Sequence, residues 1–200
     1  MSNCVGFQAI IKATTRFSKG LRYTGVVGAI CGRSEMVLPN GIGDLQKGER
    51  LVMSYLCWST LTNALRYCNM DFVFGSVLKS FEGITECIVS YDIACQWFVN
   101  LHNRIDRGWP EDLKPAENLS ITPAIPAFHH PGHGQKKHEE YDPKLVRGNG
   151  ISDNEGPERL WGPHNVLGNS TKNMGPESRH FVLDDNFSFW NWTKYANHGT

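Results

Sequence analysis

The chain lacks a net charge, because its 20 Lys and Arg residues are matched by 20 Asp and Glu residues. This balance argues against a polybasic protein held to nucleic acid by bulk charge, and against an acidic tail or a highly charged disordered chain. What is present is an ordinary composition, with 40% hydrophobic and 11% aromatic residues in 200 positions. A chain of this size and composition predicts one folded domain with a hydrophobic core.

Cysteine is absent from the second half of the chain, and histidine is absent from the first half. All six cysteines lie between positions 4 and 95, and all eight histidines lie between positions 102 and 198. The cysteines lack the dense spacing of a small disulfide-linked scaffold. The sequence also lacks a signal-peptide pattern and any apolar run long enough to span a bilayer. We therefore expect free thiols, a reducing intracellular compartment and no membrane partner.

The hydrophobic pattern predicts strands and helices in alternation. The expected strands cover residues 25–31, 34–38 and 84–91, and the expected helices cover residues 72–81 and 93–105. Residues 39–43 (PNGIG) have the composition of a turn. The prolines between residues 108 and 134 predict a long loop, and Gly162-Pro163 limits any helix over residues 158–166. We therefore expect an α/β fold whose C-terminal half is rich in loops.

Asp92 lies at the end of the strand expected over residues 84–91 and before the expected helix. Functional groups gather at the carboxyl ends of strands in open α/β sheets, and a carboxylate there is well placed to hold a divalent metal. The alternative is a helix N-cap, with Gln96 near the glutamine position of a capping box. Spacing alone favours the cap.

A second group of acids, Asp153, Glu155 and Glu158, follows a glycine-rich approach. Clustered carboxylates attract a hard cation such as Mg²⁺, although the spacing is not that of an EF-hand. The alternative is an acidic helix start, because the helix dipole stabilises acids there. Without further context the helix start is favoured.

Imidazoles are concentrated in residues 128–138 (FHHPGHGQKKH), which contain four histidines. Such a tract is a candidate Zn²⁺ site. His129 and His133 have helical spacing, but Pro131-Gly132 between them indicates a loop, and no cysteine lies nearby in the sequence. The alternative is a solvated basic loop. We expect Cys95, much earlier in the chain, to be a core thiol.

Five segments follow one another in a specific order: residues 91–96 (YDIACQ), 128–133 (FHHPGH), 153–161 (DNEGPERLW), 170–176 (STKNMGP) and 183–192 (LDDNFSFWNW). Together they resemble the KDZ (Kyakuja–Dileera–Zisupton) transposases of the fungal type. Upstream segments at residues 24–33, 45–50 and 69–71 fit the same family. The resemblance assigns residues 1–200 to the C-terminal part of a transposase catalytic domain.

The resemblance implies an RNase H-like core with a DDE-type active site. Such a site uses three carboxylates to hold two divalent cations, Mg²⁺ or Mn²⁺, during phosphodiester transfer. Asp92 matches the second acid of the family, and Glu155 matches its glutamate, in a motif that is usually Asp-Gly-Glu and is Asp-Asn-Glu here. His129 and His133 match a family histidine pair, structural or metal-binding, and His138 stands near the place of a following cysteine. These three histidines are the candidate Zn²⁺ ligands.

The family's first aspartate, on the opening strand, has no counterpart here, because residues 1–43 contain no Asp. We therefore expect an incomplete core that lacks the first strand. Two carboxylates do not easily hold two metals, so we expect the chain to be catalytically inactive by itself. An in-frame segment encoded upstream of Met1, or a partner chain that supplies the missing elements, would change this expectation.

Residues 51–67 (LVMSYLCWSTLTNALRY) interrupt the family pattern, since in relatives the flanking motifs are nearly adjacent. One hypothesis is a retained intron that has been translated. The alternative is a lineage-specific amphipathic helix. A mature transcript that encodes the segment intact would exclude the intron.

Three classes of function remain open. The first is a fragment of a DDE-type DNA transposase, for which the family implies DNA as partner and the nucleus as location. The second is a domesticated DNA-binding or protein-interaction module without catalysis, and the third is a zinc-binding structural module. Neutral charge counts against non-specific DNA binding by this part alone, because phosphate contacts need clustered Lys and Arg.

Overall fold

The computed structural model describes residues 21–46, 64–133 and 138–198. Within these ranges the chain forms two compact units. Unit 1 contains residues 82–107 and 115–155, and unit 2 contains the described residues up to 81 together with residues 108–114 and 156–198. The class is mixed α/β, as expected, and the described strands form two separate two-stranded sheets, one in each unit.

Unit 2 is built on an antiparallel hairpin of β1 (Tyr23–Ile30) and β2 (Val37–Gln46). β1 confirms the strand expected over residues 25–31. The chain reverses between these two strands, where Gly32-Arg33 are expected to turn it. The second strand begins at Val37 rather than at residue 34, and the expected turn over residues 39–43 is wrong because β2 continues through these residues. In the reversal the Cys31 amide donates to the carbonyl oxygen of Met36 at 2.8 Å.

The turn-forming residues 39–41 instead form a bulge inside β2. The pairing register shifts between Gly28 and Ile30 of β1, so β2 has extra residues that do not pair at this point. Asn40 has a φ of 55°, and a Cβ on Gly41 would lie 2.7 Å from two backbone carbonyl oxygens. Residue types that predict a turn therefore bend a strand here.

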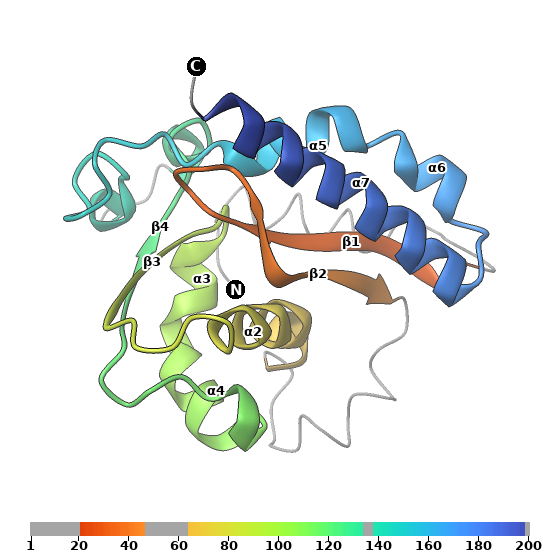
Figure 1. Cartoon of the computed structure of the whole chain (residues 1–200). Coiled ribbons are helices and arrows are strands. Elements are labelled where there is room, and N and C mark those ends of the chain that lie inside the picture. The colour runs from red at the N-terminus through yellow and green to blue at the C-terminus, as the bar shows by residue number, and fades with distance from the viewer. Residues whose placement is uncertain (1–20, 47–63, 134–137, 199–200) are drawn as a thin grey trace. The chain divides into compact units, whose positions relative to one another are not determined.

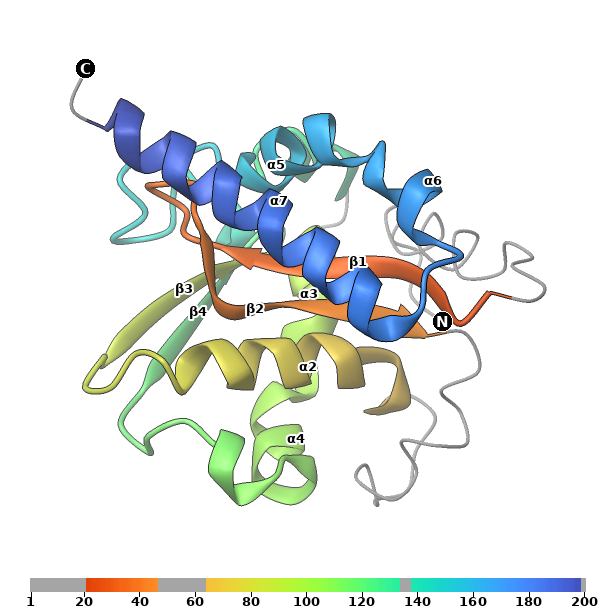
Figure 2. The same ribbon diagram turned by 45° about the vertical axis from the view of Figure 1, so that its right-hand side comes forward.

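Helices cover both faces of this hairpin (Figures 1 and 2). α2 (Ala64–Leu78) packs on one face, and α5 (Gly156–His164) and α7 (Pro176–Asn197) pack on the other. The short helix α6 (Leu167–Thr171) connects α5 to α7. α2 confirms the expected helix over residues 72–81, although it begins earlier and ends earlier.

Side-chain alternation along the strands explains the two covered faces. On one face, Val26 and Ile30 of β1 pack against a buried cluster. The cluster consists of Val37, Leu160, Leu183 and Phe187. On the other face, Gly43 lies close to Val27 and to Val73 of α2, so the helix approaches where β2 has no side chain.

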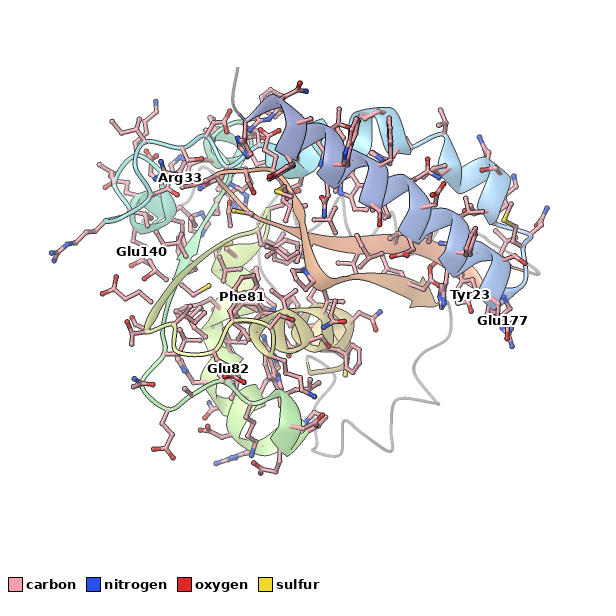
Figure 3. The ribbon with its side chains drawn as sticks, viewed as in Figure 1. Tyr23, Arg33, Phe81, Glu82, Glu140 and Glu177 are labelled. Atoms are coloured by element: carbon pink, nitrogen blue, oxygen red, sulfur yellow. The ribbon has the colours of Figure 1, made fainter. Side chains whose placement is uncertain are left out.

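A buried ion pair ties α7 to β2. Asp44 accepts hydrogen bonds from Arg179, at 2.9 Å, and from His180, at 2.8 Å. Arg179 also donates to the Thr171 hydroxyl at 2.6 Å, and its guanidinium carbon lies 5.1 Å from the ring of Tyr23. Figure 3 shows Tyr23 at this end of the hairpin, near Glu177 in the first turn of α7. The start of α7 is therefore fixed by charge as well as by packing.

A second ionic network holds the reversal between β1 and β2. Glu35 pairs with Arg159 of α5 and with Lys194 of α7, each at 2.5 Å. Burial alone would raise the pKa of Glu35, but the hydrogen bonds from Lys194 and Arg159 outweigh it and lower the pKa below its usual value. The Glu35 carbonyl also accepts from the indole nitrogen of Trp190 at 2.7 Å. The reversal is thereby attached to two helices.

Unit 1 contains β3 (Glu86–Ser90) and β4 (Ser120–Ala124), which pair in parallel. After β3 the chain is helical through α3 (Ala94–Trp97), a 3-10 turn and α4 (Leu101–Gly108). These elements confirm the expected strand over residues 84–91 and the expected helix over residues 93–105. The predicted apolar face of that helix is buried, with the exposed fraction at 8% or less for Ala94, Trp97, Leu101 and Ile105.

β4 lies within residues 108–134, which were expected to be a loop, so that expectation is wrong for residues 120–124. Pro123 lacks an N–H for a strand ladder, which is why the sequence argues against a strand there. Among the described residues β4 has a partner on one side only, and proline is tolerated at such an edge.

The expectation of a loop-rich C-terminal half is also wrong for residues 156–197, which are mostly helical. α7 begins with Pro176 and has Glu177 in its first turn, which are helix-start signals. Gly162-Pro163 was expected to end any helix over residues 158–166, and α5 does end one residue after Pro163, at His164. Of the suggested insert, residues 51–63 lie outside the described residues, and residues 64–67 begin α2.

Candidate functional site

The candidate site lies where the parallel strands of unit 1 end. The register of β3 and β4 is in step from Glu86 opposite Ser120 to Ser90 opposite Ala124, so both strands end at one edge. Asp92 follows β3 by two residues, and His129 follows β4 by five. Their side chains meet there, with His129 Nε2 lying 3.7 Å from Asp92 Oδ1. The sequence position of Asp92 at a strand end is therefore confirmed.

Asp92 is not a helix cap. The residue at the N-cap of α3 is Ile93, and no side chain caps that helix with a hydrogen bond. The Asp92 side chain is 40% exposed and that of His129 is 32% exposed, so solvent reaches both groups. A partly exposed carboxylate beside an imidazole has the donor types for cation or proton chemistry at this edge.

Glu155 reaches the same segment after a tight local turn. Its carboxylate oxygen Oε1 accepts a hydrogen bond from the backbone amide of Phe128 at 2.6 Å, one residue before His129. The neighbouring backbone also pairs, since the Ala127 amide donates to the Asp153 carbonyl oxygen at 2.9 Å. The structure thus attaches both predicted acids, Asp92 and Glu155, to the segment that follows β4.

Asn154 makes this approach of Glu155 possible. Its φ is 60°, in the left-handed region that glycine and asparagine tolerate best. The Glu155 amide donates to the Asp153 carboxylate at 3.0 Å, which closes the turn. Asn154 is 8% exposed, and its side-chain nitrogen has no hydrogen-bond partner among the described residues. Asn154 therefore contributes to the turn through its backbone conformation rather than through a side-chain hydrogen bond.

The third acid of the sequence cluster behaves differently. Glu158 lies in the first turn of α5, where the helix dipole favours an acid. For Glu158 the structure therefore agrees with the helix-start alternative. Asp153 and Glu155 come before that helix begins at Gly156.

The histidine tract divides into two groups. His129 faces Asp92, whereas His133 and His138 lie with Cys95 of α3. One ligand atom from each of Cys95, His133 and His138 lies within 4.8 Å of the others, an arrangement consistent with metal binding. Sequence reasoning missed Cys95, because 38 residues separate it from His133.

Burial dominates the electrostatics of the second group. His133 is 4% exposed, and burial lowers its pKa, as do the nearby imidazoles of His138, His130 and His129, against a hydrogen bond with the backbone of Asp92. The pKa of Tyr141 is raised by burial and then by Glu140 and Cys95. An imidazole whose pKa is lowered is neutral at pH 7 and keeps a lone pair for a ligand.

Unit 2 offers a pocket of about 500 Å³, lined among others by Tyr23, Trp161 and Phe187. Lys172 and Arg179 are among its lining residues, and the Arg179 guanidinium is already paired with Asp44. The pocket therefore has no uncompensated charge from Arg179 to offer a ligand.

Comparison with known proteins gives one family. The family model of the Kyakuja-Dileera-Zisupton (KDZ) transposase matches residues 1–191. Neither the curated proteins nor the solved structures contain a significant match. Among the described residues no helix has the length and apolar character needed to cross a membrane. The family match covers nearly all of the chain, so the chain belongs to the KDZ transposase family.

Proposed function

We propose that the chain is part of the catalytic domain of a DNA transposase and provides two acids of a DDE-type site. The observation that carries this proposal is that both acids contact the segment after β4, since Asp92 lies 3.7 Å from His129 and Glu155 is hydrogen-bonded to the Phe128 amide. Family membership supports DNA as the substrate and the nucleus as the location. In this proposal β1 to β4 belong to an RNase H-like core that lacks its first strand.

The chemistry assigned to the two acids is cation binding. Carboxylate oxygens are the preferred ligands of Mg²⁺ and Mn²⁺, and Asp92 and Glu155 would hold such a cation against a DNA phosphate. A bound cation polarises a phosphoryl oxygen and activates the attacking water or hydroxyl. The Phe128 amide orients the Glu155 carboxylate, and His129 lies where it can accept or donate a proton beside Asp92.

The proposal includes inactivity of residues 1–200 in isolation. The two-metal arrangement uses three acids, and no Asp occurs in residues 1–43, where the resemblance places the first one. We therefore expect no Mg²⁺- or Mn²⁺-dependent cleavage of supercoiled plasmid above that of a Glu155→Ala control. Metal-dependent cleavage that is lost in Glu155→Ala would overturn the inactivity while supporting the site.

Cation binding tests the site itself, independently of turnover. Mn²⁺ titration followed by electron paramagnetic resonance should show a site that Asp92→Asn and Glu155→Gln each weaken. Glu117→Gln is the matched control, because Glu117 is an exposed acid of the same unit. Equal Mn²⁺ binding by all three variants and the unmodified chain would contradict the assignment.

A second candidate function is a protein-interaction module that has lost catalysis. It is favoured by exposed aromatic residues on α7, where Phe189 and Trp192 stack with ring centroids 6.1 Å apart and are 66% and 63% exposed. Apolar side chains exposed in this way are typical of binding surfaces. A Phe189→Ser, Trp192→Ser variant that leaves binding to nuclear proteins unchanged would argue against this function.

A further inference from the structure

Three side chains from separate segments of unit 1 converge on one buried point. Cys95 lies on α3, His133 ends a 3-10 helix over His130–His133, and His138 begins another over His138–Tyr141. Cys95 and His133 are each 4% exposed, and His138 is partly buried. Their ligand atoms all lie within 4.8 Å of one another. A thiol and two imidazoles are the donor types that zinc prefers.

The distance between the two most buried donors fits a shared tetrahedral ion. Cys95 Sγ lies 3.7 Å from His133 Nδ1. Two ligands bound at about 2.3 Å for sulfur and about 2.05 Å for nitrogen, at a tetrahedral angle, lie about 3.6 Å apart. The pair is therefore already spaced as zinc ligands are, and small side-chain rotations bring in the third donor.

The outer hydrogen bonds orient both imidazoles. His138 Nδ1 donates to the carbonyl oxygen of His133 at 2.7 Å, which leaves Nε2 as its ligand atom. The imidazole of His133 hydrogen-bonds the backbone of Asp92 in addition to approaching Cys95. The carbonyl oxygen of His138 in turn accepts from His130 at 2.9 Å. Metal-binding histidines characteristically direct their second nitrogen to such a backbone partner, which fixes the tautomer.

The surroundings argue against a catalytic thiol at this position. Cys95 belongs to a buried cluster with Ala94 and Ile125, and Tyr91 and Tyr141 pack against it. A nucleophilic cysteine must be accessible to its substrate, whereas Cys95 is 4% exposed. Sulfur and imidazole ligands also disfavour Mg²⁺ and Ca²⁺, which take oxygen ligands.

We propose that Cys95, His133 and His138 bind one Zn²⁺, with water as the fourth ligand. The proposal concerns a different ion and different residues from the Asp92 and Glu155 site, so either can fail without the other. The ion would link α3 to the segment after β4. Cys95 is three residues from Asp92 and His133 is four residues from His129, so the ion would also hold the strand edge in shape.

Metal analysis of the purified chain tests the proposal directly. We expect about one zinc per chain and a strong loss of affinity in Cys95→Ser and His138→Ala. The loss should exceed the roughly 10- to 100-fold that follows removal of an outer hydrogen-bonding partner. Cys87→Ser is the matched control, because Cys87 is a partly buried thiol on β3 outside the group. Less than a tenth of an equivalent of zinc, or unchanged affinity in Cys95→Ser, would overturn the proposal.

Two further measurements use the unmodified chain, in case Cys95→Ser folds poorly. Substitution by Co²⁺ should give the ultraviolet charge-transfer band of a cobalt thiolate and the visible bands of a tetrahedral ion. In urea that opens the buried cluster, zinc should also protect Cys95 from alkylation, with Cys87 as internal reference in mass spectrometry. Absence of the thiolate band, lack of protection, or a site that binds copper and rejects zinc would each overturn the zinc assignment.

Discussion

Arg179→Ala probes the buried ion pair that fixes α7 to β2 in unit 2. Arg179 is 3% exposed and the Asp44 side chain is 8% exposed, so the substitution leaves a carboxylate in the core without its main partner. Removing one member of a buried pair costs about 3–5 kcal/mol, because the remaining charge is no longer compensated. His180 still donates to Asp44, which places the expected loss near the lower end, at about 3 kcal/mol.

His180→Ala is the matched control, because it removes the other hydrogen-bonding partner of the same carboxylate. The His180 side chain is 63% exposed, so solvent screens its interaction with Asp44. Loss of an exposed ion pair costs about 0–1 kcal/mol. The two substitutions remove partners of the same carboxylate that differ strongly in burial, and Arg179→Ala additionally removes the contacts of Arg179 with Thr171 and Tyr23.

Urea denaturation followed by tryptophan fluorescence measures both variants, since Trp109, Trp161 and Trp190 belong to unit 2. A double variant, Arg179→Met with Asp44→Leu, leaves no buried charge and should regain most of the stability lost in Arg179→Ala. Equal losses for Arg179→Ala and His180→Ala would refute the reasoning. So would a double variant no more stable than Arg179→Ala.

Three smaller predictions concern backbone conformation and pH. At Asn154, whose φ is 60°, the Asn154→Gly variant should be at least as stable as the unmodified chain. In urea denaturation the Asn154→Ala variant should be about 1–2 kcal/mol less stable than Asn154→Gly, because alanine disfavours the left-handed conformation. Equal stability of the two variants would contradict this. Gly75→Ala should destabilise unit 2 although alanine favours helix, because the new Cβ would lie 2.9 Å from the Trp109 ring; a raised melting temperature would count against it. The stabilisation by Glu35 should be complete above its unfolded pKa of about 4.3 and should decline as the pH falls through its lower folded pKa. The difference in unfolding free energy between the unmodified chain and Glu35→Gln should therefore shrink in acid. A difference that stays constant down to pH 2 would exclude the mechanism.

The hydrophobic pattern of the sequence predicted the strands and helices whose burial repeats at a fixed spacing along the chain. The β-branched runs of β1 and β3 and the apolar face of the helix after β3 were all read correctly, because burial on one face repeats at a fixed period. The reading failed where one residue type serves two purposes. Residues 39–41 bend a strand instead of making a turn, and Pro123 occupies an edge strand instead of a loop. The pairing with a neighbouring strand decides between these outcomes, and the composition of the segment itself does not contain that pairing.

Gly75 shows the same division within a helix. In the sequence it is a weak point of a helical pattern, since glycine lowers helix propensity. In the structure the backbone of α2 passes so close to Trp109 and Leu113 that a side chain at this position would collide with them. The reason for glycine therefore lies in a contact with residues more than 30 positions away.

The sequence by itself determined the family and the positions of the two acids, because linked motifs keep their order whatever the fold around them. It placed Asp92 at a strand end and Glu155 in a short acidic segment. Only the tertiary structure decided which histidine lies beside Asp92 and which histidines lie beside Cys95. Pairing of β3 with β4 sets His129 against Asp92, and the helix after β3 brings Cys95 to His133 and His138. Donor atoms far apart in the chain form a site only when packing brings them together, and spacing along a sequence does not contain that information.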